Sequence, residues 1–274
     1  MQIITANGAR LPRLGFGTYG MKGSGLATII AAALRAGFRH IDTAQMYANE
    51  GDVGRGIVES GLARAEVFVT SKVWVSDYVR GRIGPSIDES LRRLSTDYID
   101  LMLLHWPGSS VPLVEQLGGL NDAVRAGKVR HIGVSNYNRA LMAEAIGLSD
   151  APIVTNQVEY HPYLDQRLLL TAAREAGVSI TAYCAMAVGR VFDDAKLQEI
   201  AKRHGRSVSQ IVLRWLIQQE NVLALSRTSN PSRLAENVAV FDFELSANEM
   251  AAIFALARPG SRIVDPPQLA PTWD

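Results

Sequence analysis

Short apolar runs alternate with longer amphipathic stretches along almost the whole chain. Buried strands are expected at residues 38–42, 67–72, 98–104, 129–134, 153–157, 178–183 and 222–226, with a weaker strand at 14–18. Helices, with apolar residues three and four positions apart, are expected at residues 25–36, 51–60, 82–94, 111–126, 138–147, 165–176, 194–203, 208–219, 231–239 and 247–257. Strands that alternate with helices predict an α/β fold with a parallel sheet.

The N-terminal residues depart from this pattern. Asn7-Gly8 separates IITA from ARLPRL, and such a pair between two apolar runs predicts a β-hairpin over residues 2–14. No linker or low-complexity segment interrupts the rest, so we expect a single domain over residues 1–274. The count of strand–helix units and the length both suit a β/α barrel.

Composition narrows the possible partners. The 28 lysines and arginines nearly balance the 27 aspartates and glutamates, so no overall field favours nucleic acid or a membrane. No apolar run approaches the ~20 residues that span a bilayer, and the first residues do not resemble a signal peptide. The single cysteine, Cys184, excludes an internal disulfide. We therefore expect a cytoplasmic protein that acts on a small molecule, with a monomer as the default oligomeric state.

Polar side chains that can carry chemistry stand at the ends of three successive predicted strands. Asp42, Lys72 and His105 close the runs FRHID, VFVTSK and YIDLMLLH, and Tyr47 lies in the loop after Asp42. The carboxyl ends of barrel strands share one face, so these side chains should converge on one pocket. Taken singly, each residue also suits a structural role.

Together, the four side chains suit the reduction of a carbonyl group. Such a reaction needs a proton donor near the carbonyl oxygen. A neighbouring cation favours the phenolate form of a tyrosine, so Lys72, anchored by Asp42, could lower the pKa of Tyr47. His105 would orient or polarise the carbonyl.

A glycine-rich segment offers a competing interpretation. GFGTYG (15–20) matches the G-x-G-x-x-G pattern of a Rossmann dinucleotide-binding turn, with Asp42 as its acidic residue. Pro12 and Arg13 stand where that fold needs a buried apolar strand, and the next helix starts too late. We therefore favour a loop at the end of the first barrel strand, where glycines let a ligand approach the backbone.

Long, ordered segments of the chain resemble the aldo-keto reductase family, most closely its bacterial members that reduce small keto compounds and sugars. The matching segments are GFGTYG (15–20), FRHIDTAQMYANE (38–50), TSKVW (70–74), DYIDLMLLHWP (97–107), GKVRHIGVSNY (127–137), NQVEYHPYL (156–164), SQIVLRWLIQ (209–218) and RLAENVAVFDFELS (233–246). This resemblance implies a (β/α)8 TIM barrel with an N-terminal hairpin and extra C-terminal helices, which binds NADP(H) without a Rossmann domain. It casts Tyr47 as the general acid, Lys72 and Asp42 as its tuning pair, and His105 as the residue that places the carbonyl.

The resemblance also assigns residues to the cofactor. Amide and hydroxyl groups at strand ends would hold the nicotinamide carboxamide, and Tyr183 would stack beneath the ring; from composition alone, polar helix caps are an equal alternative. In the run LSRTSNPSRLAEN (225–237), a helix start and two arginines would bind the adenosine 2′-phosphate, with Glu236 and Asn237 facing adenine. We therefore predict a preference for NADP, although arginine replaces the family's common lysine at position 227. The expected cofactor residues are Gly17, Thr18, Ser135, Asn136, Gln157, Tyr183, Ser226, Arg227, Thr228, Ser229, Arg233, Glu236 and Asn237.

The expected substrate-binding residues are Tyr19, Trp74, His105 and Trp106. Tyr19 replaces the more usual tryptophan, and CAMAVGR follows Tyr183 where Ser-Pro-Leu is common, which leaves the pyrophosphate contacts of residues 184–194 open. The proline-rich tail, residues 257–274, should be irregular and border the substrate. These features favour an open pocket that accepts several aldehydes or ketones.

Two other classes of function stay open. A metal-dependent barrel hydrolase could use His40, Asp42, His105, His131 and His161, but the sequence lacks H-x-H and H-E-x-x-H, so no metal is expected. A barrel that binds the cofactor as a redox sensor or scaffold would keep the same fold. The complete Asp-Tyr-Lys-His set favours catalysis.

Overall fold

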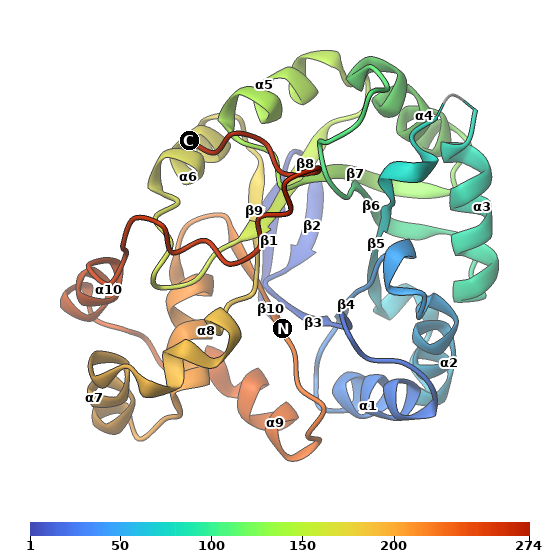
Figure 1. Cartoon of the computed structure of the whole chain (residues 1–274). Coiled ribbons are helices and arrows are strands. Elements are labelled where there is room, and N and C mark those ends of the chain that lie inside the picture. The colour runs from blue at the N-terminus through green and yellow to red at the C-terminus, as the bar shows by residue number, and fades with distance from the viewer. Residues whose placement is uncertain (80) are drawn as a thin grey trace.

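A closed barrel of parallel strands forms the centre of the molecule (Figure 1). The structure is a computed structural model that describes residues 1–79 and 81–274. The strands follow one another around the barrel in the order β10-β3-β4-β5-β6-β7-β8-β9, as chain order in a (β/α)8 fold requires. They are β3 (Leu14–Gly17), β4 (His40–Asp42), β5 (Phe68–Val73), β6 (Ile99–Leu104), β7 (Val129–Ser135), β8 (Ile153–Glu159), β9 (Ser179–Tyr183) and β10 (Val222–Ser226).

Helices surround this barrel on its outer side (Figure 1). They are α1 (Ser24–Arg35), α2 (Glu50–Ser60), α3 (Ile83–Leu94), α4 (Leu113–Arg125), α5 (Arg139–Leu148), α6 (Arg167–Glu175), α7 (Ala195–His204), α8 (Val208–Gln218), α9 (Ser232–Val238) and α10 (Ala247–Phe254). The predicted elements are confirmed with small shifts at their ends. The helix expected from residue 165 begins at Arg167, because the Asp165 carboxylate accepts the Arg167 backbone N–H and occupies the turn before the helix.

An antiparallel hairpin of β1 (Ile3–Ala6) and β2 (Ala9–Pro12) forms as Asn7-Gly8 predicted. Its apolar side chains, with Ile4 and Leu11 among them, form one buried cluster with Leu101, Leu103 and Leu223 from the strands. Alternation along a strand turns these three leucines to the barrel interior. The hairpin therefore closes the amino end of the barrel and leaves the carboxyl end as its mouth.

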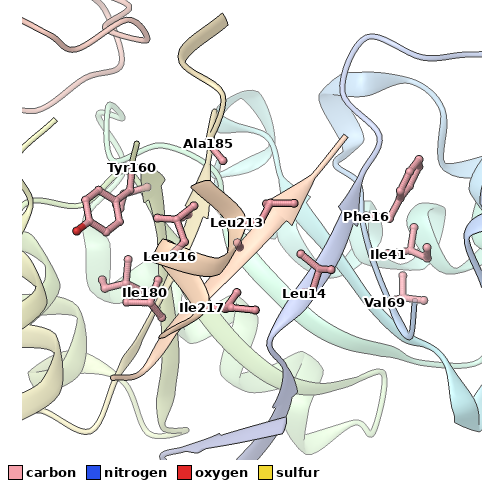
Figure 2. Close-up of a cluster of buried hydrophobic side chains, with 14 of the residues drawn as sticks. Leu14, Phe16, Ile41, Val69, Tyr160, Ile180, Ala185, Leu213, Leu216 and Ile217 are labelled. Atoms are coloured by element: carbon pink, nitrogen blue, oxygen red, sulfur yellow. The ribbon is translucent and has the colours of Figure 1, made fainter. Parts of the chain in front are cut away.

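The main core lies between the strands and the helices. Figure 2 shows Leu213, Leu216 and Ile217 of α8 close to the strands, with Ile180 of β9 and Tyr160 on the neighbouring side. Full burial of such side chains stabilises the fold by about 1.5–3 kcal/mol each. This outer layer leaves the barrel interior free to carry polar side chains at the mouth.

The chain beyond α10 forms an irregular tail, as its proline content predicted. It runs across the strands in front of β8 and β9 and ends beside α6 (Figure 1). Backbone hydrogen bonds join Arg258 to Tyr163 and Gly108 to Leu269, and Asp274 pairs with Arg139 at the start of α5. Among the residues described, no helix has the length and apolar character needed to span a membrane.

Candidate active site

Asp42 and Lys72 form a buried ion pair inside the barrel mouth. They lie on adjacent parallel strands, and the Lys72 Nζ donates to Asp42 Oδ1 at 2.6 Å and to the Thr43 carbonyl at 2.8 Å. Lys72 is 0% exposed. Burial lowers the pKa of Lys72, while the charge of Asp42 and its hydrogen bond oppose that shift. Because two acceptors hold the ammonium group, one of its three protons stays available to a neighbour.

That neighbour is Tyr47, which the short helical turn Gln45–Tyr47 places directly after β4. The Lys72 Nζ lies 5.1 Å from the centre of the Tyr47 ring. Burial and the Asp42 charge raise the pKa of Tyr47 well above its usual value, so the lowered pKa expected from Lys72 is wrong for this structure. Desolvation is the largest cause of this rise in the pKa of Tyr47. Tyr47 therefore keeps its proton at neutral pH.

His105 completes this group just beyond the end of β6. Its ring meets the edges of the Tyr47 and Trp74 rings, at centroid distances of 5.8 and 5.2 Å. Burial, followed by the nearby Lys72 charge, lowers the pKa of His105 well below 6.5. The imidazole is therefore neutral at physiological pH and carries one N–H that can donate to a carbonyl oxygen. The four predicted catalytic residues thus converge at the mouth.

The residues expected to hold a carboxamide are hydrogen-bonded to this group. Gln157 Nε2 donates to Asp42 Oδ2 at 2.7 Å, across 115 positions of sequence. Asn136 Nδ2 donates to the His105 carbonyl at 3.0 Å, and the Tyr183 hydroxyl donates to Asn136 Oδ1 at 2.7 Å. Ser135 Oγ donates to the Gln157 carbonyl at 2.8 Å. These contacts connect the proposed cofactor side of the mouth to the proposed catalytic side.

The segment after β10 places two arginines on the surface. Arg227 donates from Nε to the Tyr19 carbonyl at 2.6 Å, which leaves its terminal nitrogens open. Across residues 1–79 and 81–274, neither Arg227 nor Arg233 takes part in an ion pair. Ser229 is exposed as well. One guanidinium group on the loop after β10 and one in the first turn of α9 (Ser232–Val238), both without an ion-pair partner among the described residues, suit the binding of a phosphate.

Other residues of this segment are already hydrogen-bonded within the protein. The buried Asn237 donates from its amide to Ser226 Oγ at 2.7 Å, and Glu236 accepts from the Ser207 hydroxyl. Thr228 Oγ1 accepts the Asn230 N–H at 3.0 Å. Their predicted contacts with adenine and phosphate stay predictions.

The glycine-rich loop borders the same mouth. A Cβ atom at Gly17 would make only ordinary contacts, with Leu225 at 3.8 Å and the Ser226 carbonyl at 3.9 Å, although the residue itself is buried. Thr18 is also fully buried, and its hydroxyl donates to the Asp42 carbonyl at 2.9 Å. In this structure Thr18 fixes the end of β4.

Three aromatic residues were expected to line the substrate pocket. Tyr19 is 61% exposed, and its ring lies 5.1 Å from that of Tyr47, so it stands beside the proposed catalytic group. Trp74 contacts His105 as described. Trp106 is only 5% exposed, and its carbonyl accepts from the Tyr78 hydroxyl at 3.1 Å. The contact of Tyr78 with Trp106 was not predicted, since the sequence around Tyr78 carries no signal for it.

The histidines considered as metal ligands lie in separate environments. His40 Nε2 is 2.9 Å from Thr70 Oγ1, and His161 Nε2 is 2.9 Å from Glu159 Oε1. Within the part of the chain that the structure describes, no group of three or more His, Cys, Asp or Glu side chains could hold a metal ion. The geometry thus brings the proposed tetrad together, whereas His40 and His161 lie in separate hydrogen-bonded environments.

The fold and the mouth together define a (β/α)8 oxidoreductase barrel whose residues fit a nicotinamide dinucleotide phosphate. A cluster of amide side chains lies at this mouth, together with two arginines that have no ion-pair partner within the described residues. The model of the aldo/keto reductase family matches residues 13–258. The chain belongs to this family.

Named relatives place the chain among bacterial reductases. It is 38% identical to the methylglyoxal reductase DkgB of Salmonella typhi, over 96% of this chain and 99% of that protein. It is also 38% identical to the glyoxal reductase of Bacillus subtilis, over 91% of this chain and 90% of the relative.

Solved structures agree with this placement. A crystal structure described as that of a candidate 2,5-diketo-D-gluconic acid reductase B is 56% identical, with a TM-score of 0.99 over 100% of this chain and 98% of the other. An aldo-keto reductase of Bombyx mori in complex with NADP is 33% identical, with a TM-score of 0.87 over 93% of this chain and 92% of the other.

Proposed function

We propose that this protein reduces small aldehydes and ketones to alcohols with NADPH. The observation that carries this proposal is the convergence of Tyr47, Lys72, Asp42 and His105, with a protonated phenol beside a buried cation and a neutral imidazole. Family membership and the reductase names of the relatives support it.

Each residue has a distinct part in the proposed reaction. The His105 N–H donates to the substrate oxygen and turns the carbonyl toward Tyr47. A reduced nicotinamide, when bound, would supply the hydride for the carbonyl carbon. Tyr47 gives its proton to the oxygen as negative charge develops there, which completes the alcohol. Lys72, held by Asp42, stabilises the phenolate that remains until a proton from solvent restores it.

The cofactor would lie across the mouth from β7 to β10. Ser135, Asn136 and Gln157 would bind the carboxamide, with the Tyr183 ring beneath the nicotinamide. Arg227 and Arg233 would bind the 2′-phosphate, which favours NADPH over NADH because only NADPH carries that group. Their lack of an ion pair within the described residues supports this assignment.

The substrates would be small carbonyl compounds, including dicarbonyls of the kind named for the relatives. The exposed Tyr19 leaves the pocket open on one side, which suits several substrates. Oxidation of NADPH, followed with methylglyoxal, glyoxal, simple aldehydes, ketones and keto sugars, tests the function. We expect the enzyme to reduce several of these compounds. If it reduces none of them, the proposed function is wrong. Steep selectivity for one bulky compound would contradict the open pocket. The monomeric state and the cytoplasmic location stay predictions.

A further inference from the structure

Glu159 contacts the C-terminal tail through a pair of hydrogen bonds that the proposed reaction does not use. It lies at the end of β8 and is 0% exposed. Its Oε1 accepts the Ile263 backbone N–H at 2.8 Å, and its Oε2 accepts the Val264 backbone N–H at 2.8 Å. A carboxylate that binds two successive backbone N–H groups fixes the position of the chain whatever side chains that chain carries.

The surroundings hold this carboxylate in place. His161 Nδ1 accepts the Tyr163 backbone N–H at 3.3 Å, so the other ring nitrogen carries the hydrogen and donates to Glu159 Oε1 at 2.9 Å. Arg262 precedes the two bound residues and supplies a nearby positive charge, with its guanidinium 3.5 Å from the centre of the Trp273 ring. The carboxylate is thus oriented from the barrel side and partly neutralised from the tail side.

The anchored tail reaches the loop that carries His105. The Gly108 N–H donates to the Leu269 carbonyl at 3.2 Å, three positions beyond His105 in the sequence. A Cβ atom on Gly108 would lie 2.6 Å from Leu269 Cα, so the two backbones are in close contact. Glu159, at the end of β8, and Gly108, in the loop after β6, therefore hold the same tail at two separate points of the mouth.

We propose that Glu159 is a positioning residue that sets carbonyl selectivity by clamping residues 263–264 and thereby placing residues 268–269 against the loop after His105. The clamp acts on the backbone, so the register of the tail is fixed while its side chains are free to shape the pocket. Glu159 touches neither the proposed proton donor nor its cation. Its removal should change substrate binding and leave the chemical step and cofactor binding in place.

The test compares Glu159→Gln with wild type in the full-length protein. Gln keeps the shape, but its NH2 group can only donate where the carboxylate oxygen accepted, so one tail N–H loses its partner. We expect faster hydrogen exchange at the amides of Ile263 and Val264, and a several-fold higher KM for methylglyoxal with kcat retained. The Kd for NADPH, from tryptophan fluorescence, should not change. Glu220→Gln, at a side chain 69% exposed, is the matched control and should change none of these quantities.

Gly108→Ala gives an independent test, because it displaces the tail at residues 268–269 while Glu159 stays intact. The KM of this variant should also rise. In the double variant, the change in the free energy that corresponds to KM should be smaller than the sum of the two single changes, since both substitutions release the same segment. Unchanged exchange at residues 263 and 264 in Glu159→Gln, or fully additive effects on KM, would overturn the clamp. If Glu159→Gln does not fold, an unchanged KM in Gly108→Ala overturns it. The kinetic tests rest on the proposed function, whereas the hydrogen-exchange measurement does not. If the wild-type protein has no reductase activity, the proposed function is wrong, but hydrogen exchange at residues 263 and 264 still tests the clamp.

Discussion

Two buried aspartates, one at each end of the barrel, show how the same type of side chain can have different roles. Asp100, near the start of β6, accepts the Val69 N–H at 3.0 Å and pairs with Arg64 at 2.7 Å and Arg130 at 3.1 Å. Both guanidinium groups also lie over the Tyr98 ring. Asp42, at the mouth, has one cationic partner, Lys72, which is fully buried.

The difference lies in how much solvation each pair gives up. The side chains of Arg64 and Arg130 are 22% and 49% exposed, so the charges at the closed end keep part of their hydration. Lys72 loses all of its hydration, and one of its N–H groups remains available to Tyr47. Such a buried charge lowers the stability of the fold unless every partner is present. The closed end is therefore arranged for stability, whereas the mouth keeps charges whose use is chemical.

The largest effect should follow removal of one hydroxyl at the mouth. Tyr47→Phe removes the proposed proton donor, and we expect kcat for methylglyoxal to fall by ~10²–10⁴-fold. No hydrogen bond joins this hydroxyl to another group among the described residues, so the thermal midpoint should stay close to that of wild type. Steady-state assays and thermal unfolding check both points. Undiminished turnover would show that another group supplies the proton.

A second variant separates stability from chemistry within the mouth. Lys72→Met leaves Asp42 buried without its cation, so the free energy of unfolding should fall by about 3–5 kcal/mol and activity should be lost. Adding Asp42→Asn removes the stranded charge. We expect the double variant to regain much of the stability in urea unfolding but none of the activity; regained activity would contradict the role given to Lys72.

The arginines at the two ends of the barrel offer the third contrast. At the closed end, Arg64 and Arg130 form ion pairs with Asp100. At the mouth, Arg227 and Arg233 have no ion-pair partner among the described residues. The double variant Arg227→Ala, Arg233→Ala should lose about 1.5–3 kcal/mol of NADPH binding for each charged hydrogen bond removed. NADH use should hardly change. The ratio of kcat/KM for NADPH to that for NADH is the measurement, and an unchanged ratio would remove the 2′-phosphate assignment.

Asp100→Asn tests the closed end by itself. The substitution weakens bonds to two arginines and one backbone N–H, and we expect a loss of about 1–3 kcal/mol in the free energy of unfolding. Because the site lies at the other end of the barrel, kcat/KM for methylglyoxal should equal that of wild type. A fall in kcat/KM without a fall in stability would show that the two ends are coupled.

The last prediction concerns acid stability. Burial lowers the pKa of His40 to about 4 and that of His105 well below 6.5. Between pH 6.5 and 4 the unfolded chain therefore binds protons that the folded protein does not, and stability falls as the pH is lowered. Each histidine contributes at most about 1.4 kcal/mol per pH unit. Urea unfolding at pH 7 and pH 5 measures the slope, which His40→Asn should reduce; equal slopes would contradict the burial argument.

The comparison also shows what could be predicted from the sequence. Alternating apolar runs placed Asp42 and Lys72 at strand ends, and the common direction of barrel strands brought them and His105 to one face. The direction of the Tyr47 pKa shift could not be obtained in this way, because it depends on how deeply the ring is buried. Strand periodicity describes which face a residue occupies and contains no measure of depth.

Contacts through the backbone were likewise beyond prediction. Lys72 donates to the carbonyl of Thr43, and Glu159 accepts from the N–H groups of Ile263 and Val264. Every residue type offers such groups, so the sequence gives no signal for them. The bond from Gln157 to Asp42 joins side chains on strands across the barrel, and it needs the closed geometry to exist.

The closure of the barrel by the hairpin has a practical consequence for anyone who expresses the protein. A purification tag fused before Met1 would extend from the sealed end, remote from the working face. A tag fused after Asp274 would instead continue a segment whose last residue pairs with Arg139 beside the opening. Amino-terminal fusions are thus the safer choice for kinetic work, and a carboxyl-terminal fusion would itself disturb what is being measured.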